Sequence, residues 1–334
     1  MVNQNQLSVN NNAYYPSKQA LSHLVRQLQS PKIKRAIKPG FIARTDGFSV
    51  DEIVGRLETL PEQAGLLSQL LSTSDLTEKT YSRFADNPNS LYNWHPAVEA
   101  AIDVSTTELK SPKTKVMRLP IELAQFIRIE YQDTAQHDKD LFNRFIFDQF
   151  GLEDDTTYFI KTGTFSSKFQ FTNAKCSEPR EMGEYFQVIN NFAMQVGAGH
   201  SIDLVVREYI EDVENNPTIY NGMPLRTEFR VFVDCDKNEL IGVVPYWHPI
   251  VMKRALQSGL SRSIQQDYQT YRNMEQKLVD TYNEYLHRVK KEIIAILPNL
   301  NLSGQYSIDV MKNGSDLYVI DLALMNDSAL TELL

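Results

Sequence analysis

Short, turn-bounded runs of β-branched and aromatic residues fill the second half of the chain, and this pattern most restricts its fold. Six such runs follow Gly151: 158–161, 204–210, 227–234, 240–246, 305–311 and 317–322. Residues of these types pack well on pleated strands. Helical stretches at Glu181 to Val196 and Ser263 to Leu297 separate them, and the longer carries an apolar stripe. Hairpin strands with helices on one side predict an α+β fold with antiparallel sheets, not a doubly wound parallel sheet.

The region before Gly151 is predicted to be mostly helical. Val50 to Leu60 and Pro61 to Leu71 have helical patterns, and core helices are expected after Pro120 and over Asp138 to Phe150. A length of 334 residues suits two lobes. We predict a basic acid-free arm over 1–45, a helical N-terminal lobe over 46–150, a central lobe over 151–210 and a C-terminal lobe over 211–334.

Charge is unevenly distributed along the chain. No Asp or Glu precedes Asp46, although the net charge of the whole chain is −8. The net charge weighs against coating nucleic acid or anionic membranes through bulk charge. The basic segment 18–44 is either a solvated amphipathic helix with a basic loop, or a docking arm for an acidic protein partner or nucleic acid.

Cysteine use and hydropathy point to the cytoplasm. Cys176 and Cys235 are the only cysteines, so no disulfide framework is expected. No run of about 18 apolar residues is present to span a membrane, and residues 1–12 lack the apolar core of a secretory signal. We expect a cytoplasmic protein without membrane contact.

The most informative motif is the hairpin signal Asn313-Gly314 between two strand-like runs. If its loop is the three residues 313–315, Asp309 and Asp321 share one face of the hairpin as a diagonal pair about 7–8 Å apart. A loop of two or four residues would put them on opposite faces. Carboxylates among apolar neighbours need a positive partner. Magnesium with nucleotide phosphates is one candidate, Arg230 or a Lys is another, and exposure of both acids to solvent is the third.

Two further patterns suit phosphate. Glu228 and Arg230 lie two apart on a predicted strand, so they share a face, and a guanidinium can bind phosphate oxygens in pairs or form a cross-strand salt bridge. Lys161 ends a strand and is followed by a Gly/Ser/Thr loop that reaches Lys168. Such a loop can offer backbone amides and ammonium groups to phosphates, although it lacks the Walker A spacing.

Taken in order, these segments resemble the ATP-grasp superfamily, and within it the cell-division-cycle family that assists assembly of a translation initiation factor. The resemblance covers residues 115 to 326. Its motifs are Arg118-Leu119-Pro120, Lys161 with Ser166-Ser167-Lys168, Arg207 to Ile210, Glu228 to Val233 with Leu240 to Gly242, Asp309-Val310 and Ile320-Asp321. It implies two α+β lobes with antiparallel sheets that grip ATP and Mg²⁺ between them, after a helical N-terminal region.

The resemblance also implies roles for single residues. Lys161 would contact the α or β phosphate, with Ser166, Ser167 and Lys168 on the loop over the phosphates. Glu208, Tyr209 and Ile210 would line the adenine. Glu228 would contact the nucleotide, and Arg230 would face the γ phosphate or an acyl phosphate, so that Arg230 and Lys168 are the catalytic candidates. Asp309 and Asp321 would hold magnesium.

One position departs from the superfamily pattern, which usually has Asn two residues after the second acidic ligand. Here that residue is Ala323, and Asn326 is the nearest amide that could replace it. This departure bears on turnover more than on nucleotide binding. An ATP-dependent ligase that joins a carboxylate to an unknown acceptor is one expected function. The alternatives are an ATP-binding assembly factor with little or no catalysis, which holds a protein partner, and a nucleotidyltransferase for nucleic-acid ends with Lys161 as nucleophile.

Overall fold

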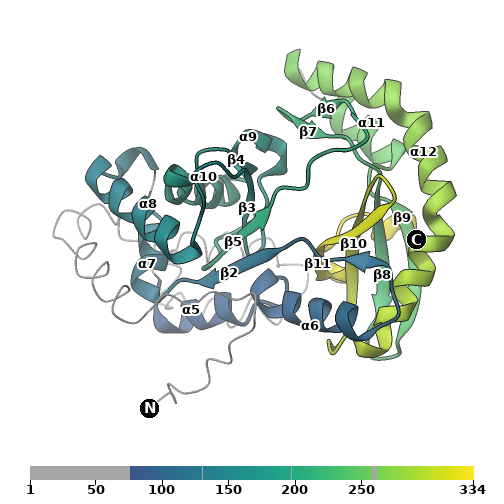
Figure 1. Ribbon diagram of the computed structural model, residues 1–334, viewed down its shortest axis with the longest axis horizontal. Coiled ribbons are helices and arrows are strands. Elements are labelled where there is room, and N and C mark those ends of the chain that lie inside the picture. The colour runs from purple at the N-terminus through teal and green to yellow at the C-terminus, as the bar shows by residue number, and fades with distance from the viewer. Residues whose placement is uncertain (1–75, 130, 197, 258–261) are drawn as a thin grey trace, which may run out of the picture. The chain divides into compact units, whose positions relative to one another are not determined.

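The computed structural model describes residues 76–334 apart from residues 130, 197 and 258–261 (Figure 1). The chain divides into two compact units. The first holds the described residues up to Tyr92, with Thr114–Ser167 and Asn173–Tyr209; the second holds Asn93–Lys113, Lys168–Thr172 and Ile210–Leu334. The basic arm and the helices expected between Val50 and Leu71 lie outside the described residues.

A four-stranded antiparallel sheet forms the centre of the first unit, with strand order β2-β5-β3-β4. Its strands are β2 (Thr114–Arg118), β3 (Tyr158–Thr162), β4 (Lys175–Cys176) and β5 (Asp203–Glu208). β3 and β5 coincide with two of the six predicted strands. β2 and β4 are absent from the prediction, because β4 has two residues and β2 stands just before a helical pattern.

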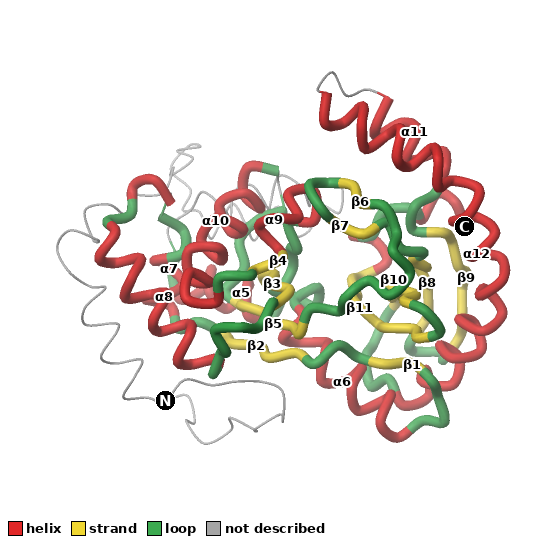
Figure 2. Tube along the Cα trace, turned by 45° about the horizontal axis from the view of Figure 1, so that its top comes forward, coloured by secondary structure: helices red, strands yellow, loops and turns green. Residues whose placement is uncertain are grey.

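Helices cover one face of this sheet and form the core with it (Figure 2). These helices are α5 (Glu78–Ala85), α7 (Ile121–Phe126), α8 (Gln136–Phe150) and α10 (Met182–Gln195). The short helix α9 (Phe171–Ala174) is divided between the two units. Phe142 and Ile146 of α8 pack with Phe186 of α10 and Ile160 of β3. α8 ends at Gly151, whose φ of +55° suits glycine. The expected helices after Pro120 and over Asp138 to Phe150 are confirmed.

The second unit contains a five-stranded sheet with order β1-β11-β10-β8-β9. Its strands are β1 (Leu109–Lys110), β8 (Glu228–Asp234), β9 (Glu239–Pro245), β10 (Gln305–Asn313) and β11 (Asp316–Leu324). Neighbours are antiparallel except β1, which pairs with β11 in parallel. A separate hairpin joins β6 (Thr218–Ile219) to β7 (Met223–Pro224). The four long strands coincide with predicted ones.

One long helix packs against this sheet. The helices here are α6 (Leu91–Val104), α11 (Pro249–Gln257) and α12 (Arg262–Ile296), and α12 runs alongside β9 (Figure 2). Phe229 of β8 stacks on Tyr282 of α12 at 5.1 Å between ring centroids, and Tyr282 Oη donates to the carbonyl of Val243 at 2.8 Å. Because side chains alternate along β8, Glu228 and Arg230 lie on the face turned away from α12.

The predicted α+β class with antiparallel sheets is confirmed. α11 was not expected, since the sequence pattern there is short. Among the helices of the described residues, not one has both the length and the apolar composition that crossing a bilayer requires.

Candidate functional site

The loop of the β10–β11 hairpin is shorter than the three residues that a diagonal pair of acids required. It has two residues, Gly314 and Ser315, because Asn313 pairs with Asp316 as a strand residue. Gly314 takes a φ of +62°, the conformation that a glycine at the first position of a tight hairpin turn provides. Of the loop lengths considered, the two-residue loop is therefore the one formed, and the diagonal pairing that required three residues is not.

A β-bulge nevertheless brings the two carboxylates together. The register shifts between Asp309 and Val310, where β11 contributes Ile320 as the extra residue. Asp309 then lies directly opposite Asp321 instead of diagonally. Residues directly opposite each other on antiparallel strands point to the same face, so both acids face the same side of the sheet. Bulges commonly re-aim side chains beside functional sites.

Arg230 extends this arrangement into a row across three strands. It lies opposite Asp309 on the β8–β10 ladder. Its Nε and NH2 groups donate to the two carboxylate oxygens of Asp309, each at 2.8 Å, and its NH1 donates to the carbonyl of Ala329 at 3.2 Å. The Asp309 and Arg230 side chains are only 8% and 12% exposed. Asp309 thus pairs with Arg230, which is one of the alternatives that the sequence left open.

Lys168 lies beside this row, on aromatic rings. Its Nζ is 4.1 Å from the ring centroid of Tyr246 and 5.7 Å from that of Trp247. Arg230 stacks on the same Tyr246 ring at 4.6 Å. Cations over aromatic faces are stabilised by the ring quadrupole. Tyr246 therefore holds two of the predicted site cations.

Burial shifts two ionisable groups in opposite directions. Burial raises the pKa of Glu228 to about 7, and the charge of Lys168 opposes this shift. Burial lowers the pKa of Lys168, and Glu228, Asp309 and Asp321 oppose that shift. Glu228, Asp309 and Asp321 thus act electrostatically on both Lys168 and Arg230.

We expect Glu228→Gln to flatten the dependence of stability on pH. Glu228 has a higher pKa folded than unfolded, so its stabilising contribution is complete below pH 4.5 and is lost as pH rises through about 7. From pH 5 to pH 8, the unfolding free energy of wild type should fall by about 1–3 kcal/mol more than that of the variant. Urea denaturation at both pH values measures this. Glu239→Gln, at an exposed position of β9, is the control, and parallel curves for Glu228→Gln and wild type would contradict the assignment.

The first unit carries a group of cations on one sheet face. Lys161 of β3, Lys175 of β4 and Arg207 of β5 share the face of Phe159, since Phe159 pairs with both Lys175 and Arg207. The opposite face, with Ile160, is the core face. Arg207 Nε donates to Thr114 Oγ1 at 3.2 Å. The sequence pattern did not indicate Lys175, because nothing around this single basic residue before Cys176 marks it as part of a strand.

A buried network fixes the loop that follows Lys161. The backbone N–H of Gly163 donates to the carbonyl of Asp203 at 2.8 Å and to Ser201 Oγ at 3.1 Å. The fully buried carboxylate of Asp203 accepts from Arg118 at 2.7 Å and from Ser90 at 2.5 Å. A Cβ at Gly163 would lie 2.3 Å from Ser90 Oγ, so only glycine fits there.

The two serines of the loop differ in exposure. Ser166 is partly buried and Ser167 fully so, with a φ of +48° at Ser167. The hydroxyl of Ser167 makes no hydrogen bond with the residues that the structure describes. Ser167 is the last residue of its segment of the first unit, and Lys168 belongs to the second. The two predicted phosphate lysines, Lys161 and Lys168, are therefore supplied by different units.

The three residues expected to line the adenine, Glu208, Tyr209 and Ile210, differ in the sheet face or the unit to which they belong. Glu208 pairs with Tyr158 and therefore points to the face opposite Lys161. Tyr209, the last residue of the first unit, has Lys175 Nζ 4.2 Å from its ring centroid. Ile210 begins the second unit's longest segment. A contact of Glu208 with adenine on the face of Lys161 would have to use its backbone.

Asn326 is exposed in the short turn Met325–Asp327, and within the described residues its amide makes no hydrogen bond to the row. Ala323 lies opposite Ser307, whose hydroxyl is 2.6 Å from that of Ser328. Ser307 therefore points to the same face of the hairpin as Ala323. Within the described residues, no group of three or more His, Cys, Asp or Glu is placed to hold a metal. Two carboxylates and a nucleotide's phosphate oxygens remain a suitable donor set for magnesium.

No protein-family model and no curated protein matches the chain. Among solved structures it is similar to C-terminally truncated Cdc123 from Schizosaccharomyces pombe, at 13% identity and a TM-score of 0.44, covering 78% of this chain and 90% of that one. It is also similar to D-alanine–D-alanine ligase from Bacillus anthracis complexed with ATP, at 8% identity and a TM-score of 0.33, covering 94% and 84%. The resemblance stated from the sequence motifs names the same kinds of protein.

Proposed function

We propose that the protein binds Mg-ATP and acts as an ATP-dependent ligase of the ATP-grasp type. The observation that carries this proposal is the row Arg230–Asp309–Asp321 on one sheet face, with Lys168 and Glu228 beside it. Carboxylates in a row with a guanidinium and an ammonium suit a magnesium ion together with phosphate oxygens.

The residues of the row fit this role chemically. Asp309 and Asp321 would supply oxygens to magnesium. Both oxygens of Asp309 accept hydrogen bonds from Arg230, and each has a further lone pair for a cation. Arg230 and Lys168 would then face the γ phosphate, where negative charge moves during transfer.

In the proposed reaction an oxygen of a substrate carboxylate attacks the γ phosphorus of ATP. The bond from this phosphorus to the β–γ bridging oxygen breaks, and ADP leaves with the electron pair. A nucleophile such as an amine then attacks the acyl carbon, loses a proton and releases inorganic phosphate. Arg230 and Lys168 would stabilise the charge on the transferring group, and magnesium would offset charge on the phosphates.

Residues of the first unit, together with Ile210 of the second, complete the proposal. Lys161, Ser166 and Ser167 would contact the phosphates, and Tyr209 and Ile210 would line the adenine, with Glu208 acting through its backbone. What supports the phosphate role is the shared face of Lys161, Lys175 and Arg207.

Asp321→Asn is expected to weaken Mg-ATP binding at least tenfold, about 1.4 kcal/mol, because an amide carries no charge for the cation. Binding of ATP without magnesium should change less than twofold. Isothermal titration calorimetry with and without magnesium measures both. Asp316→Asn is the matched control, since Asp316 lies on the same strand and pairs with Lys110 at the surface. Equal Mg-ATP affinities for Asp321→Asn and wild type would sink the proposal.

A second function is favoured by Ala323, which takes the place of a usual metal-site amide. The protein would then bind Mg-ATP with little turnover and hold a protein partner as an assembly factor. ADP release that requires an added carboxylate and amine identifies the ligase. A stoichiometric protein partner whose retention requires Mg-ATP, without ADP release, identifies the assembly factor.

A further inference from the structure

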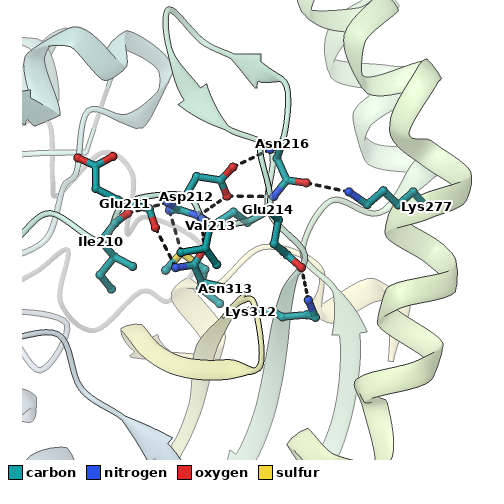
Figure 3. Close-up of polar contacts among 11 residues, drawn as sticks. Ile210, Glu211, Asp212, Val213, Glu214, Asn216, Lys277, Lys312 and Asn313 are labelled. Carbon is teal, nitrogen blue, oxygen red and sulfur yellow. Dashed lines mark hydrogen bonds and ion pairs between the residues drawn. The ribbon is translucent and has the colours of Figure 1, made fainter.

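A connector of residues 210–216 follows the last residue of the first unit and is hydrogen-bonded to the end of β10, just before the hairpin turn (Figure 3). The connector, the hairpin and the start of β8 all belong to the second unit. Three sets of polar contacts join them. Together these contacts make the connector and the metal-site hairpin one piece of structure.

Asn313 makes the central contact. Its Oδ1 accepts from the backbone N–H of Val213 at 3.2 Å, and its Nδ2 donates to the carbonyl of Glu211 at 2.9 Å. One amide thus pairs with the backbone groups on both sides of Asp212 (Figure 3). Asn313 is buried, 6% exposed. Aspartate has the acceptor but lacks the donor, so the contact requires an amide.

The residues flanking Asn313 add to the same attachment. Lys312 Nζ donates to Glu214 on the connector, and its backbone N–H donates to the carbonyl of Thr227 at 2.9 Å. On the other side, a Cβ at Gly314 would lie 3.0 Å from Val213 Cγ2, so the turn packs closely on the connector.

Arg226, just before β8, holds the start of the connector. Its NH2 donates to the carbonyl of Ile210 at 2.6 Å, and its Nε donates to Asp212 at 3.2 Å. Asp212 in turn accepts from the backbone N–H of Asn216 at 2.6 Å. Lys277 of α12 donates to the Asn216 side chain at 3.2 Å (Figure 3).

We infer that Asn313 is a positioning residue for Mg-ATP, because it fixes the connector that begins at Ile210 in register with Asp309, four residues earlier on β10. This rests on the proposed function, in which Ile210 contacts the adenine and Asp309 the magnesium. Two parts of one ligand bind more tightly to elements that are already held in place, since the ordering cost is met in folding. Asn313 therefore sets how strongly the adenosine part adds to triphosphate binding.

The test compares Mg-ATP with magnesium and inorganic triphosphate in calorimetric titrations. Asn313→Ala should weaken Mg-ATP binding tenfold or more and leave the affinity for magnesium triphosphate within twofold of wild type, because triphosphate has no adenosine part to contact Ile210. Asn313→Asp should show the same selective loss, since it lacks the donor to Glu211. Loss that is equal for both ligands, or no loss for either, would overturn the inference.

Tyr282→Phe is the control for a purely structural effect. It removes a hydrogen bond to Val243 in the same unit, away from the connector, and should leave the ratio of the two affinities unchanged. A Tyr282→Phe ratio that falls as far as that of Asn313→Ala would also overturn the inference. If wild type binds no Mg-ATP, the proposed function fails and takes this inference with it; an unchanged ratio in Asn313→Ala defeats the inference alone.

Discussion

Arg230→Met is expected to lower the unfolding free energy of the second unit by about 3 kcal/mol. The variant leaves the Asp309 carboxylate, 8% exposed, without the guanidinium that donates to both of its oxygens. A buried charge deprived of its partner is far more costly than the pair is worth. Lys168 still acts on Asp309 electrostatically, which keeps the loss near the lower end of the usual range.

The measurement is urea denaturation followed by tryptophan fluorescence, since Trp94 and Trp247 both belong to the second unit. Arg288→Met is the control, because Arg288 pairs with Glu108 at the surface and should cost less than about 1 kcal/mol. Arg230→Met combined with Asp309→Leu should recover most of the lost stability, since neither charge of this pair is then left buried without the other. Equal losses for Arg230→Met and Arg288→Met would refute the buried-pair explanation.

Strands with a strong alternating pattern were predictable from the sequence. Along β8, Phe229 and Val231 face the helix side while Glu228 and Arg230 remain on the other face. The period of two encodes this directly. The same alternation predicted β10 and β11, the two strands that carry Asp309 and Asp321.

The register of the hairpin was not predictable in the same way. Its loop length follows from whether Asn313 joins the strand or the turn, and Asn313 is drawn into the strand by contacts with the distant connector residues Glu211 and Val213. The bulge at Ile320 then reverses the consequence of the shorter loop. The shorter loop and the bulge have opposite effects on the register. The expected common face of Asp309 and Asp321 is therefore found, but with a direct instead of a diagonal pairing.

Lys175 and the division of the chain were beyond local patterns. β4 has two residues, too few to show any periodicity, and Lys175 reaches the cation face only through pairing with Phe159. The second unit gathers Asn93–Lys113 and Lys168–Thr172 from elsewhere in the sequence. Which unit such a segment joins depends on long-range packing, and this cannot be predicted from composition or residue spacing.

Lys161→Met is expected to weaken Mg-ATP binding about 100-fold, close to 3 kcal/mol. Lys161 is 2% exposed, on the sheet face that also carries Lys175 and Arg207. Methionine keeps the length and apolar contacts of the side chain and removes only the charge. Hydrogen bonds between charged groups in a buried setting are worth more than neutral ones. The loss should therefore appear as weaker phosphate binding rather than as unfolding.

Calorimetry with two ligands separates these effects. Lys161→Met should lose affinity for Mg-ATP and keep its affinity for adenosine within twofold, because adenosine has no phosphate. Lys79→Met, exposed on α5 of the same unit, should match wild type for both ligands. Unchanged Mg-ATP affinity in Lys161→Met would remove Lys161 from the phosphate site. A covalent adenylate on wild-type Lys161, seen by mass spectrometry, would instead favour the nucleotidyltransferase, since a nucleophilic lysine forms a bond to phosphorus where a binding lysine forms only contacts.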